Sequence, residues 1–270
     1  MSVSKLNPGV VNASHCSSGI LRLTLNDPAR RNALSEAMLA ALGAAFDAAS
    51  TNPDVRGIIL SAHGPVFCAG HDLKEMTAGR QNADRGRAYF TKILRQCSSV
   101  MQKIVTCPKP VIAEIDGLAT AAGCQLVASC DLAVASETAQ FCTPGVHIGL
   151  FCSTPMVALS RNLANKHAME MLLTGDMVSA SRAAEMGLVN KVVPSTELRA
   201  ASMALAGKIA AKSSLTVATG KRAFYQQKEM DLAAAYNYAS KIMVENMLAR
   251  DAEEGIAAFI EKRAPDWRDE

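Results

Sequence analysis

The chain has 270 residues, of which 49% are hydrophobic and 20% are charged, and its formal net charge is +3. This length suits one large domain, or a core with a smaller appendage, and the composition can supply a sizeable hydrophobic core. The positive residues are spread along the chain without a run of four or more, so the composition does not favour nucleic-acid binding.

The N-terminal sequence MSVSKLNPGV has neither the apolar segment of a signal peptide nor the arginine-rich pattern of a transit peptide. No apolar run reaches the roughly 18 residues that a membrane-spanning helix needs. We therefore expect no membrane association. We expect either a bacterial cytoplasmic protein or a mitochondrial-matrix protein whose leader has been removed.

Strands and helices alternate in the first part of the chain. Strands are expected at 19–25, 55–62, 111–115, 131–136 and 139–142, and helices at 35–50, from 72, at 84–105 and from about 121. This order predicts α/β architecture with much parallel pairing.

The pattern changes after about residue 154, where a single short strand is expected within 188–193. Residues 196–262 have apolar side chains at helical spacing, for example at Met243 and Met247. We expect a core over 1–195 and a helical region over 196–270 that packs on the core or on another subunit.

Eight cysteines occur in the chain, none in a CxxC pair and none clustered with the five histidines. Several, such as Cys124 and Cys130, lie in apolar runs. We expect reduced, buried thiols and no metal site.

Two loops rich in glycine and alanine each run from a predicted strand into a predicted helix. They are FCAGHD (67–72) and LATAAGC (118–124). Small residues let the backbone approach a ligand, and the first N–H groups of a helix have no partner within it. Two such groups directed at one carbonyl oxygen form an oxyanion hole. The alternative is that both loops are only tight turns.

These loops belong to a longer series of motifs: DPARRNALS, GPVFCAGHDLKEM, KPVIAEIDGLATAAGCQLVASCDLAVAS, AQFCTPGVHIGL and GIAAFIEKR. Over residues 18–263 the chain resembles the enoyl-CoA hydratase/isomerase (crotonase) superfamily. Its TAAGCQ and GLFCSTP motifs resemble the branch of enoyl-CoA hydratase domain-containing proteins. The resemblance implies a ClpP-like spiral of ββα units followed by a C-terminal helical trimerisation region. It also implies a homotrimer or a dimer of trimers that binds an acyl-CoA thioester and needs no separate cofactor.

The same resemblance assigns the oxyanion hole to the backbone N–H groups of His71 and Ala122. Hydratases of this family hold a water with two glutamates, and these positions are Gln125 and Gly145 here. Glutamine can orient a water but cannot take its proton, and general acid–base groups contribute about 10²- to 10⁴-fold. We therefore expect weak hydratase activity at best.

Several side chains could replace the missing glutamates. The His71 imidazole could transfer protons near neutral pH, or its ring could point to solvent. His147 would face the same side as position 145 if that stretch were extended, or it could be a structural loop histidine. Cys152 could be a nucleophile, although a helix start at Ser153 ahead of Pro155 is the more ordinary explanation.

Two acidic residues have ordinary explanations as well. Glu75 suits the dipole of a helix start, and Glu114 in the strand VIAEI would pair with a basic residue. The resemblance further suggests a set of CoA contacts. They are Arg30, Arg31, Ala33, Ala69, Lys74, Phe259 and Lys262, of which Lys262 could reach a neighbouring subunit's ligand.

Two classes of function follow. The chain could be an enzyme that stabilises an enolate of an acyl-CoA, as a weak hydratase, isomerase, decarboxylase or thioesterase. It could instead be a non-catalytic acyl-CoA-binding protein. A scaffold without a ligand would leave the two loops unexplained.

Overall fold

A computed structural model describes residues 9–270, so most of the N-terminal sequence used for the leader prediction lies outside the described residues. The strands form a six-stranded sheet in the order β1-β2-β3-β5-β7-β10 and a four-stranded sheet in the order β4-β6-β8-β9. The strands are β1 Val11–His15, β2 Ile20–Leu25, β3 Gly57–Ala62, β4 Val66–Cys68, β5 Val111–Ile115, β6 Leu118–Thr120, β7 Leu132–Ser136, β8 Gln140–Cys142, β9 Val178–Ser179 and β10 Lys191–Val193. All pairings are parallel except β1 with β2 and β8 with β9.

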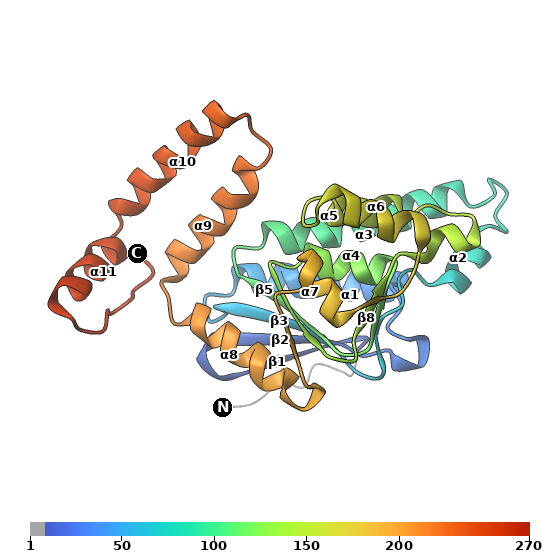
Figure 1. Cartoon of the computed structure of the whole chain (residues 1–270), viewed down its shortest axis with the longest axis horizontal. Helices are drawn as coiled ribbons and strands as arrows, with labels where there is room; N and C mark the ends of the chain where they lie inside the picture. The colour runs from blue at the N-terminus through green and yellow to red at the C-terminus, as the bar shows by residue number, and fades with distance from the viewer. Residues whose placement is uncertain (1–8) are drawn as a thin grey trace.

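The described residues form eleven α-helices, of which α1 to α8 lie around the sheets (Figure 1). They are α1 Glu36–Thr51, α2 Leu73–Gly79, α3 Arg87–Thr106, α4 Ala122–Ser129, α5 Ser153–Leu159, α6 Asn165–Thr174, α7 Ala180–Met186, α8 Leu198–Ala210, α9 Ser214–Gln227, α10 Leu232–Met247 and α11 Arg250–Glu261. None of these helices is long and apolar enough to span a membrane. The prediction of α/β architecture with much parallel pairing is confirmed.

The chain repeats one unit of two strands and a helix. β3, β5 and β7 lie in the large sheet, and each is followed at once by a strand of the small sheet and then by helix. Gly117, with φ +73°, turns the chain between β5 and β6, and a methyl group there would lie 2.0 Å from the carbonyl oxygen of Pro65. The prediction of loops at 66–68 and 118–120 is wrong, because these segments form the strands β4 and β6. Each has only three residues, too few for a strand pattern to be visible.

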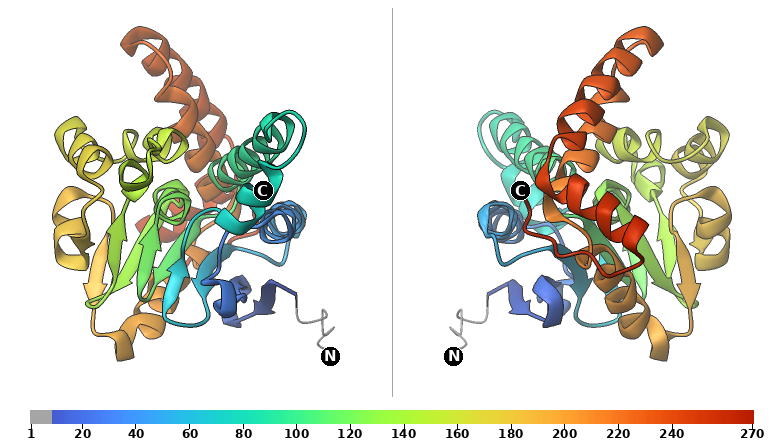
Figure 2. Two further views of the ribbon diagram at one scale, coloured as in Figure 1. Left: turned by 90° about the vertical axis from the view of Figure 1, so that its right-hand side faces the viewer. Right: turned by 90° about the vertical axis from the view of Figure 1, so that its left-hand side faces the viewer.

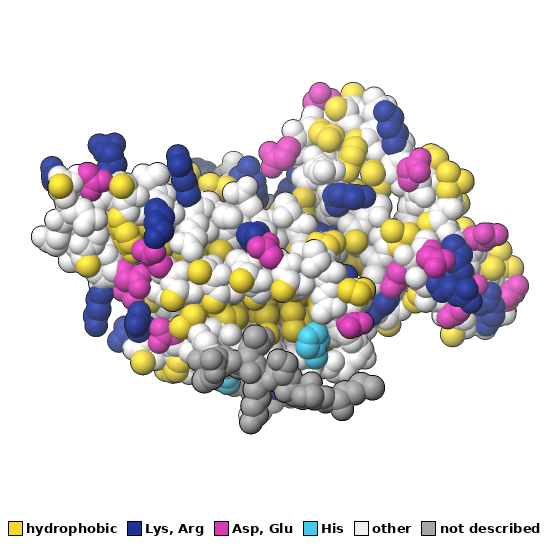
Figure 3. All heavy atoms as spheres, turned by 180° about the vertical axis from the view of Figure 1, so that it is seen from behind, with side chains coloured by type: hydrophobic (Ala, Val, Ile, Leu, Met, Phe, Trp, Pro, Cys, Tyr) yellow, Lys and Arg dark blue, Asp and Glu magenta, His cyan; other side chains and the backbone are white. Residues whose placement is uncertain are grey.

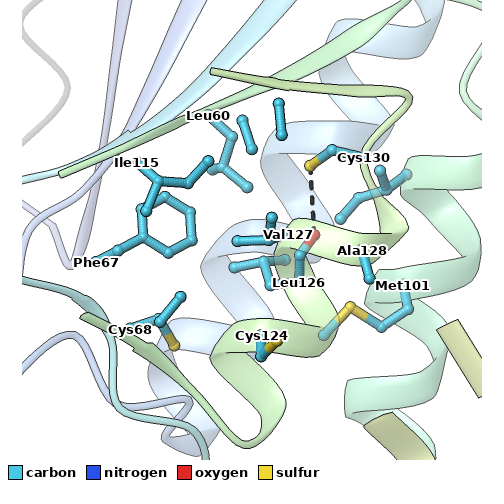
Figure 4. Packing of buried hydrophobic residues seen from close by; sticks show 14 of the residues in the cluster. Leu60, Phe67, Cys68, Met101, Ile115, Cys124, Leu126, Val127, Ala128 and Cys130 are labelled. Atoms are coloured by element: carbon cyan, nitrogen blue, oxygen red, sulfur yellow. Dashed lines mark hydrogen bonds between the residues drawn. The ribbon is translucent and has the colours of Figure 1, made fainter. Parts of the chain in front are cut away.

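Two cores flank the large sheet because its side chains alternate between the faces. Leu21, Leu23 and Leu60 face the core under α1, α3 and α4, whereas Ile20 and Ile59 face α8. Figure 4 shows Leu126 and Val127 of α4 directed toward Phe67 and Ile115. Helix α8, the first helix of the expected C-terminal region, packs on the large sheet.

Helices α9, α10 and α11 form an arm that projects from the rest of the chain (Figures 1 and 2). Its base is fixed by Lys221, whose Nζ lies 2.6 Å from Oδ2 of Asp131 and also donates to the carbonyl oxygens of Ile104 and Lys109. Tyr225 donates a second hydrogen bond to Asp131. This partly buried ion pair ties α9 to Asp131, two residues after the end of α4.

The arm exposes many large apolar side chains, which Figure 3 shows on the right of the rear view. Phe259 is 85% exposed, and the others are Phe224, Leu232, Tyr236, Met243, Val244, Met247, Leu248, Ile256 and Ile260. Apolar surface of this extent marks an interaction site. It supports the prediction of packing against another subunit, which stays a prediction.

Candidate active site

The two glycine- and alanine-rich loops lie against each other, because β4 pairs with β6 in parallel and each strand leads directly into a helix. Gly70 has φ +82°, and a methyl group on it would lie 3.0 Å from Cβ of Ala121 and 3.2 Å from N of Ala122. A methyl group on Gly123 would lie 2.1 Å from the carbonyl oxygen of Cys68. Both positions therefore need glycine for this close approach.

The backbone N–H groups of His71 and Ala122, which the resemblance assigns to an oxyanion hole, lie at this contact and have no acceptor among residues 9–270, as is also true of the neighbouring N–H group of Gly123. Ala122 is the first residue of α4, and His71 precedes Asp72, whose side chain caps α2 by accepting from the N–H groups of Lys74 and Glu75. Free N–H groups at adjacent helix starts can hold the oxygen of a polarised carbonyl.

Ala121 holds the second of these loops in a strained conformation. Its φ of +52° and ψ of −119° lie where residues other than glycine are rare, at a cost of about 1–3 kcal/mol. Its N–H donates to the carbonyl oxygen of Cys142 at 2.9 Å, and its carbonyl accepts from N of Gln125 at 3.1 Å. These bonds fix the direction of the next N–H, that of Ala122. Sequence reasoning identified only a helix start here.

The His71 imidazole is buried at both nitrogens and lies near the backbone of Leu34, but neither nitrogen forms a hydrogen bond of good geometry within residues 9–270. The alternative that the ring points to solvent is therefore wrong, because both ring nitrogens are buried. Burial lowers the pKa of His71 below its ordinary value because the charged form is poorly solvated there. The ring is thus neutral at pH 7.

Gln125 lies one turn after Ala122 on α4 and is only 4% exposed. Its side-chain Oε1 is buried without a partner within the described residues, while its backbone oxygen accepts from Oγ of Ser129 at 2.8 Å. A neutral amide at this position offers hydrogen bonds but no proton-accepting carboxylate.

Gly145 lies in a 3-10 helix, η3 (Pro144–Ile148), and its surroundings leave no room for a side chain. A methyl group there would lie 2.9 Å from Sγ of Cys152 and 2.9 Å from the carbonyl oxygen of Leu150. The N–H of Leu150 also donates to the carbonyl of Gly145 at 2.9 Å, which closes the turn. The space beside position 145 is therefore filled by Cys152 and Leu150, which the sequence could not show.

His147 does not lie on the side of Gly145, so the expectation of an extended stretch is wrong. Consecutive residues of a 3-10 helix are rotated by about 120°, whereas a strand would bring alternate residues to one side. Nε2 of His147 lies 2.8 Å from the carbonyl oxygen of Thr174 at the end of α6. This contact explains the residue as a structural one.

The thiols of Cys124, Cys142 and Cys152 are buried, and burial raises the pKa of each. Such thiols are poor nucleophiles. Helix α5 begins at Ser153 as predicted, with Pro155 in its first turn, although no side chain caps it. Within residues 9–270, no group of three or more histidine, cysteine or acidic side chains could hold a metal ion.

The two candidate acids have structural contacts. Glu114 forms two hydrogen bonds with the buried Arg22, at 2.6 and 2.9 Å, so its predicted basic partner is confirmed. Glu75 accepts from the N–H of Glu36 at 3.0 Å and so connects α2 with α1.

Five of the seven candidate CoA contacts lie on two neighbouring segments, residues 30–33 and 69–74, which are joined by a hydrogen bond from N of Leu34 to the carbonyl oxygen of Gly70. Asn32, completely buried, donates to the carbonyl oxygens of His63 and Val66 and accepts from N of Asp27. The N–H of Ala69 in turn donates to the carbonyl of Arg31 at 3.1 Å. These five candidates are Arg30, Arg31, Ala33, Ala69 and Lys74, of which only Ala33 is buried and Ala69 is partly buried. Asn32, in the motif DPARRNALS, was missed as a functional candidate.

The other two candidates lie elsewhere. Phe259 and Lys262 belong to α11 and its C-terminal end, at the opposite end of the molecule from α2 in Figure 1. One chain does not bring them to the loops.

A family model described as enoyl-CoA hydratase/isomerase matches residues 15–270. The mitochondrial enoyl-CoA hydratase domain-containing protein 3 of Rattus norvegicus is 51% identical over 249 residues, 92% of this chain and 81% of the relative. A crystal structure of an enoyl-CoA hydratase from Mycobacterium smegmatis has a TM-score of 0.91 and 50% identity, covering 96% of this chain and 98% of its own. That of human enoyl coenzyme A hydratase domain-containing protein 3 has a TM-score of 0.90 and 48% identity, covering 96% and 100%. The expected spiral of ββα units is thereby confirmed, and the chain belongs to the enoyl-CoA hydratase/isomerase (crotonase) family.

Proposed function

We propose that the chain binds an acyl-CoA and holds its thioester carbonyl oxygen with the N–H groups of His71 and Ala122. The observation that carries this proposal is the pair of unpartnered N–H groups at two loops in contact. Negative charge on that oxygen, as in an enolate, would be stabilised by the same two donors. The acyl-CoA is the substrate, and no separate cofactor is part of the proposal.

Hydration of an enoyl-CoA is expected to be slow. Gln125 cannot take a proton from water, and the place of a second carboxylate at Gly145 is filled by Cys152 and Leu150. General acid–base groups contribute about 10²- to 10⁴-fold each, so two losses reduce hydration by several powers of ten. Weak hydratase, isomerase, decarboxylase or thioesterase chemistry through the oxyanion hole is the enzymatic form of the proposal.

A second candidate function is acyl-CoA binding without turnover. The filled position at Gly145 favours it, because the site holds a ligand oxygen but has no carboxylate to activate water. Assembly as a homotrimer or a dimer of trimers through the exposed arm belongs to both versions. Phe259 and Lys262 would then contact the ligand of a neighbouring subunit. The relatives named as mitochondrial support a matrix location, and a bacterial cytoplasmic one is the alternative.

The test is calorimetric titration with crotonyl-CoA beside an assay of its hydration, followed by loss of the conjugated thioester absorbance. We expect binding with little hydration by the native chain. Gln125→Glu should raise hydration, whereas adding Gly145→Glu should not raise it further, because the new side chain would collide with Sγ of Cys152. Hydration at the rate of ordinary hydratases by the native chain would overturn the proposal that Gln125 and Gly145 limit it. Absence of binding would overturn the oxyanion hole itself.

A further inference from the structure

Residues 264–270 follow α11 and fold back onto the base of the arm (Figure 2). Helix α11 ends before Lys262, whose φ of +56° lies in the left-handed region and turns the chain. The N–H of Arg263 then donates to the carbonyl oxygen of Ala258 at 3.0 Å, which closes this turn. We refer to residues 264–270 as the strap. Three sets of contacts hold it against the arm and the core.

The first set is made by Asp251 in the first turn of α11. Its carboxylate is buried, and its two oxygens accept from the backbone N–H groups of Arg268 and Asp269, each at 2.9 Å. The guanidinium of Arg250 lies 3.2 Å from the same carboxylate. Hydrogen bonds to an ionised group are about twice as strong as neutral ones, and the strap supplies two of them.

The second set is made by Trp267, the single tryptophan of the chain. Its ring nitrogen donates to the carbonyl oxygen of Ala211, directly after α8, at 3.0 Å. Its ring lies against Gly255 of α11, where an added methyl group would lie 2.9 Å from the ring carbon Cη2. Trp267 therefore joins the last helix of the arm to the end of a helix that packs on the large sheet.

The third set reaches the core through Arg56, directly before β3. Arg56 forms an ion pair with Asp269 at 2.8 Å. The same guanidinium donates to the carbonyl oxygens of Ala210 at 2.8 Å and Lys212 at 2.6 Å, where the chain passes from α8 to α9. Asp269 also accepts from the backbone N–H of Ser214, the first residue of α9. One core side chain thus holds both the strap and the connection between α8 and α9.

The strap is able to open separately from the core, because none of residues 264–270 belongs to either hydrophobic core. Each of them is exposed except Trp267, which is partly buried. Segments with few buried apolar contacts open locally at a small cost in free energy.

We propose that the strap is a conformational latch. When closed it holds α11 and the connection between α8 and α9 in one position against the core. When open it frees both, while the core stays folded and α9 remains attached through Lys221 and Asp131. Since α11 exposes Ile256, Phe259 and Ile260, the latch sets how this apolar surface is presented.

Asp251→Asn tests the latch in the full chain. An amide has one oxygen instead of two, so it cannot accept from both Arg268 and Asp269 in the same geometry. We expect the strap to open, and acrylamide quenching of the Trp267 fluorescence to rise toward that of the urea-unfolded chain. Glu253→Gln is the matched control, because it removes the same charge from the first turn of α11 at an exposed position. It should leave the quenching unchanged.

Limited trypsin digestion reads the connection between α8 and α9. Once the strap is open, Arg56 and Ser214 lose their partner Asp269. Cleavage after Lys212, which lies in this connection, should then be faster than in the native chain. Far-UV circular dichroism should show that the rest of the chain still melts cooperatively.

Gly255→Ala is a second test that changes no charge. Its methyl group would collide with the ring of Trp267, so quenching should rise here too, although alanine favours a helix more than glycine does. Gly220→Ala is its control in α9, because a methyl group there meets nothing within 4 Å. This control should leave the quenching unchanged.

Unchanged quenching in both Asp251→Asn and Gly255→Ala would overturn the latch. So would an equal rise in Glu253→Gln, which would assign the effect to the charge of α11. Exposure of Trp267 without faster cleavage after Lys212 would show that the strap does not hold the connection. Loss of cooperative melting in both test variants would show that the strap does not open separately from the core. No readout involves an acyl-CoA, so each of these failures would leave the proposed function standing.

Discussion

Gly70→Ala tests whether the contact between the two loops builds the oxyanion hole. The new methyl group would lie 3.0 Å from Cβ of Ala121, 3.1 Å from the carbonyl oxygen of Thr120 and 3.2 Å from N of Ala122, so the loops must separate by a few tenths of an ångström. The backbone φ of +82° adds about 1–2 kcal/mol of strain, and overpacking adds about 1–3 kcal/mol. We expect the free energy of unfolding to fall by about 2–5 kcal/mol.

Gly187→Ala is the matched control. Gly187 has a similar φ of +87°, but a methyl group there would meet only the carbonyl oxygen of Asn162 at 3.8 Å. It should lose only the strain, about 1–2 kcal/mol, and keep its affinity for crotonyl-CoA. Gly70→Ala should bind that ligand at least tenfold more weakly, measured by calorimetry, with stability measured by urea unfolding. If both variants lose the same stability and neither loses affinity, the reasoning about the loop contact is refuted.

Three further predictions concern buried groups. Lys221→Met leaves Asp131 without its cation and should lower the free energy of unfolding, measured by urea titration, by about 3 kcal/mol. A loss below about 1 kcal/mol would show that the ion pair does not fix the arm. The pKa of His71 is lower in the folded state than its ordinary value of about 6.5, so the unfolded chain binds more protons. The free energy of unfolding should therefore fall as the pH drops below about 6.5. In His71→Phe the melting temperature should fall less between about pH 7.5 and about pH 5.5 than in the native chain. If both chains lose the same amount, the pH dependence comes from other groups. Gln125→Leu should leave the melting temperature unchanged or higher, since it removes a buried acceptor that has no protein partner, and a fall of several degrees would reveal a hidden partner.

The sequence led to the family and to the two loops at His71 and Ala122 that lie against each other, because the loop motifs are local and contiguous. Gln125 was located in the same way, as was the helix start at Ser153. Glu114 was expected to pair, although its partner Arg22 lies 92 residues away. That separation in sequence shows the limit: a strand pattern indicates that Glu114 is buried, but not that Arg22 of β2 reaches it across β3.

Other features of the site depend on contacts between distant segments. The space beside Gly145 is occupied because residues 150–152 fold back onto η3. The spacing of residues in the sequence does not predict this contact. Ala121 has a positive φ, which alanine rarely adopts, so its residue type gives no sign of this strained conformation. The burial of the His71 ring depends on the packing of neighbouring elements, and its exposed alternative was equally compatible with the sequence.

Helix α4 has a consequence for communication within the molecule. Its first residue, Ala122, has the N–H group that we propose for the oxyanion hole, and Asp131, two residues beyond its end, forms an ion pair with Lys221 of the arm. At 1.5 Å per residue this helix is a rod about 12 Å long. Since coupling free energies are reciprocal, a ligand that shifts α4 changes the stability of the arm's attachment as much as that attachment changes ligand affinity. We therefore expect ligand binding at the start of α4 and the attachment of the arm to be coupled through this one rigid helix.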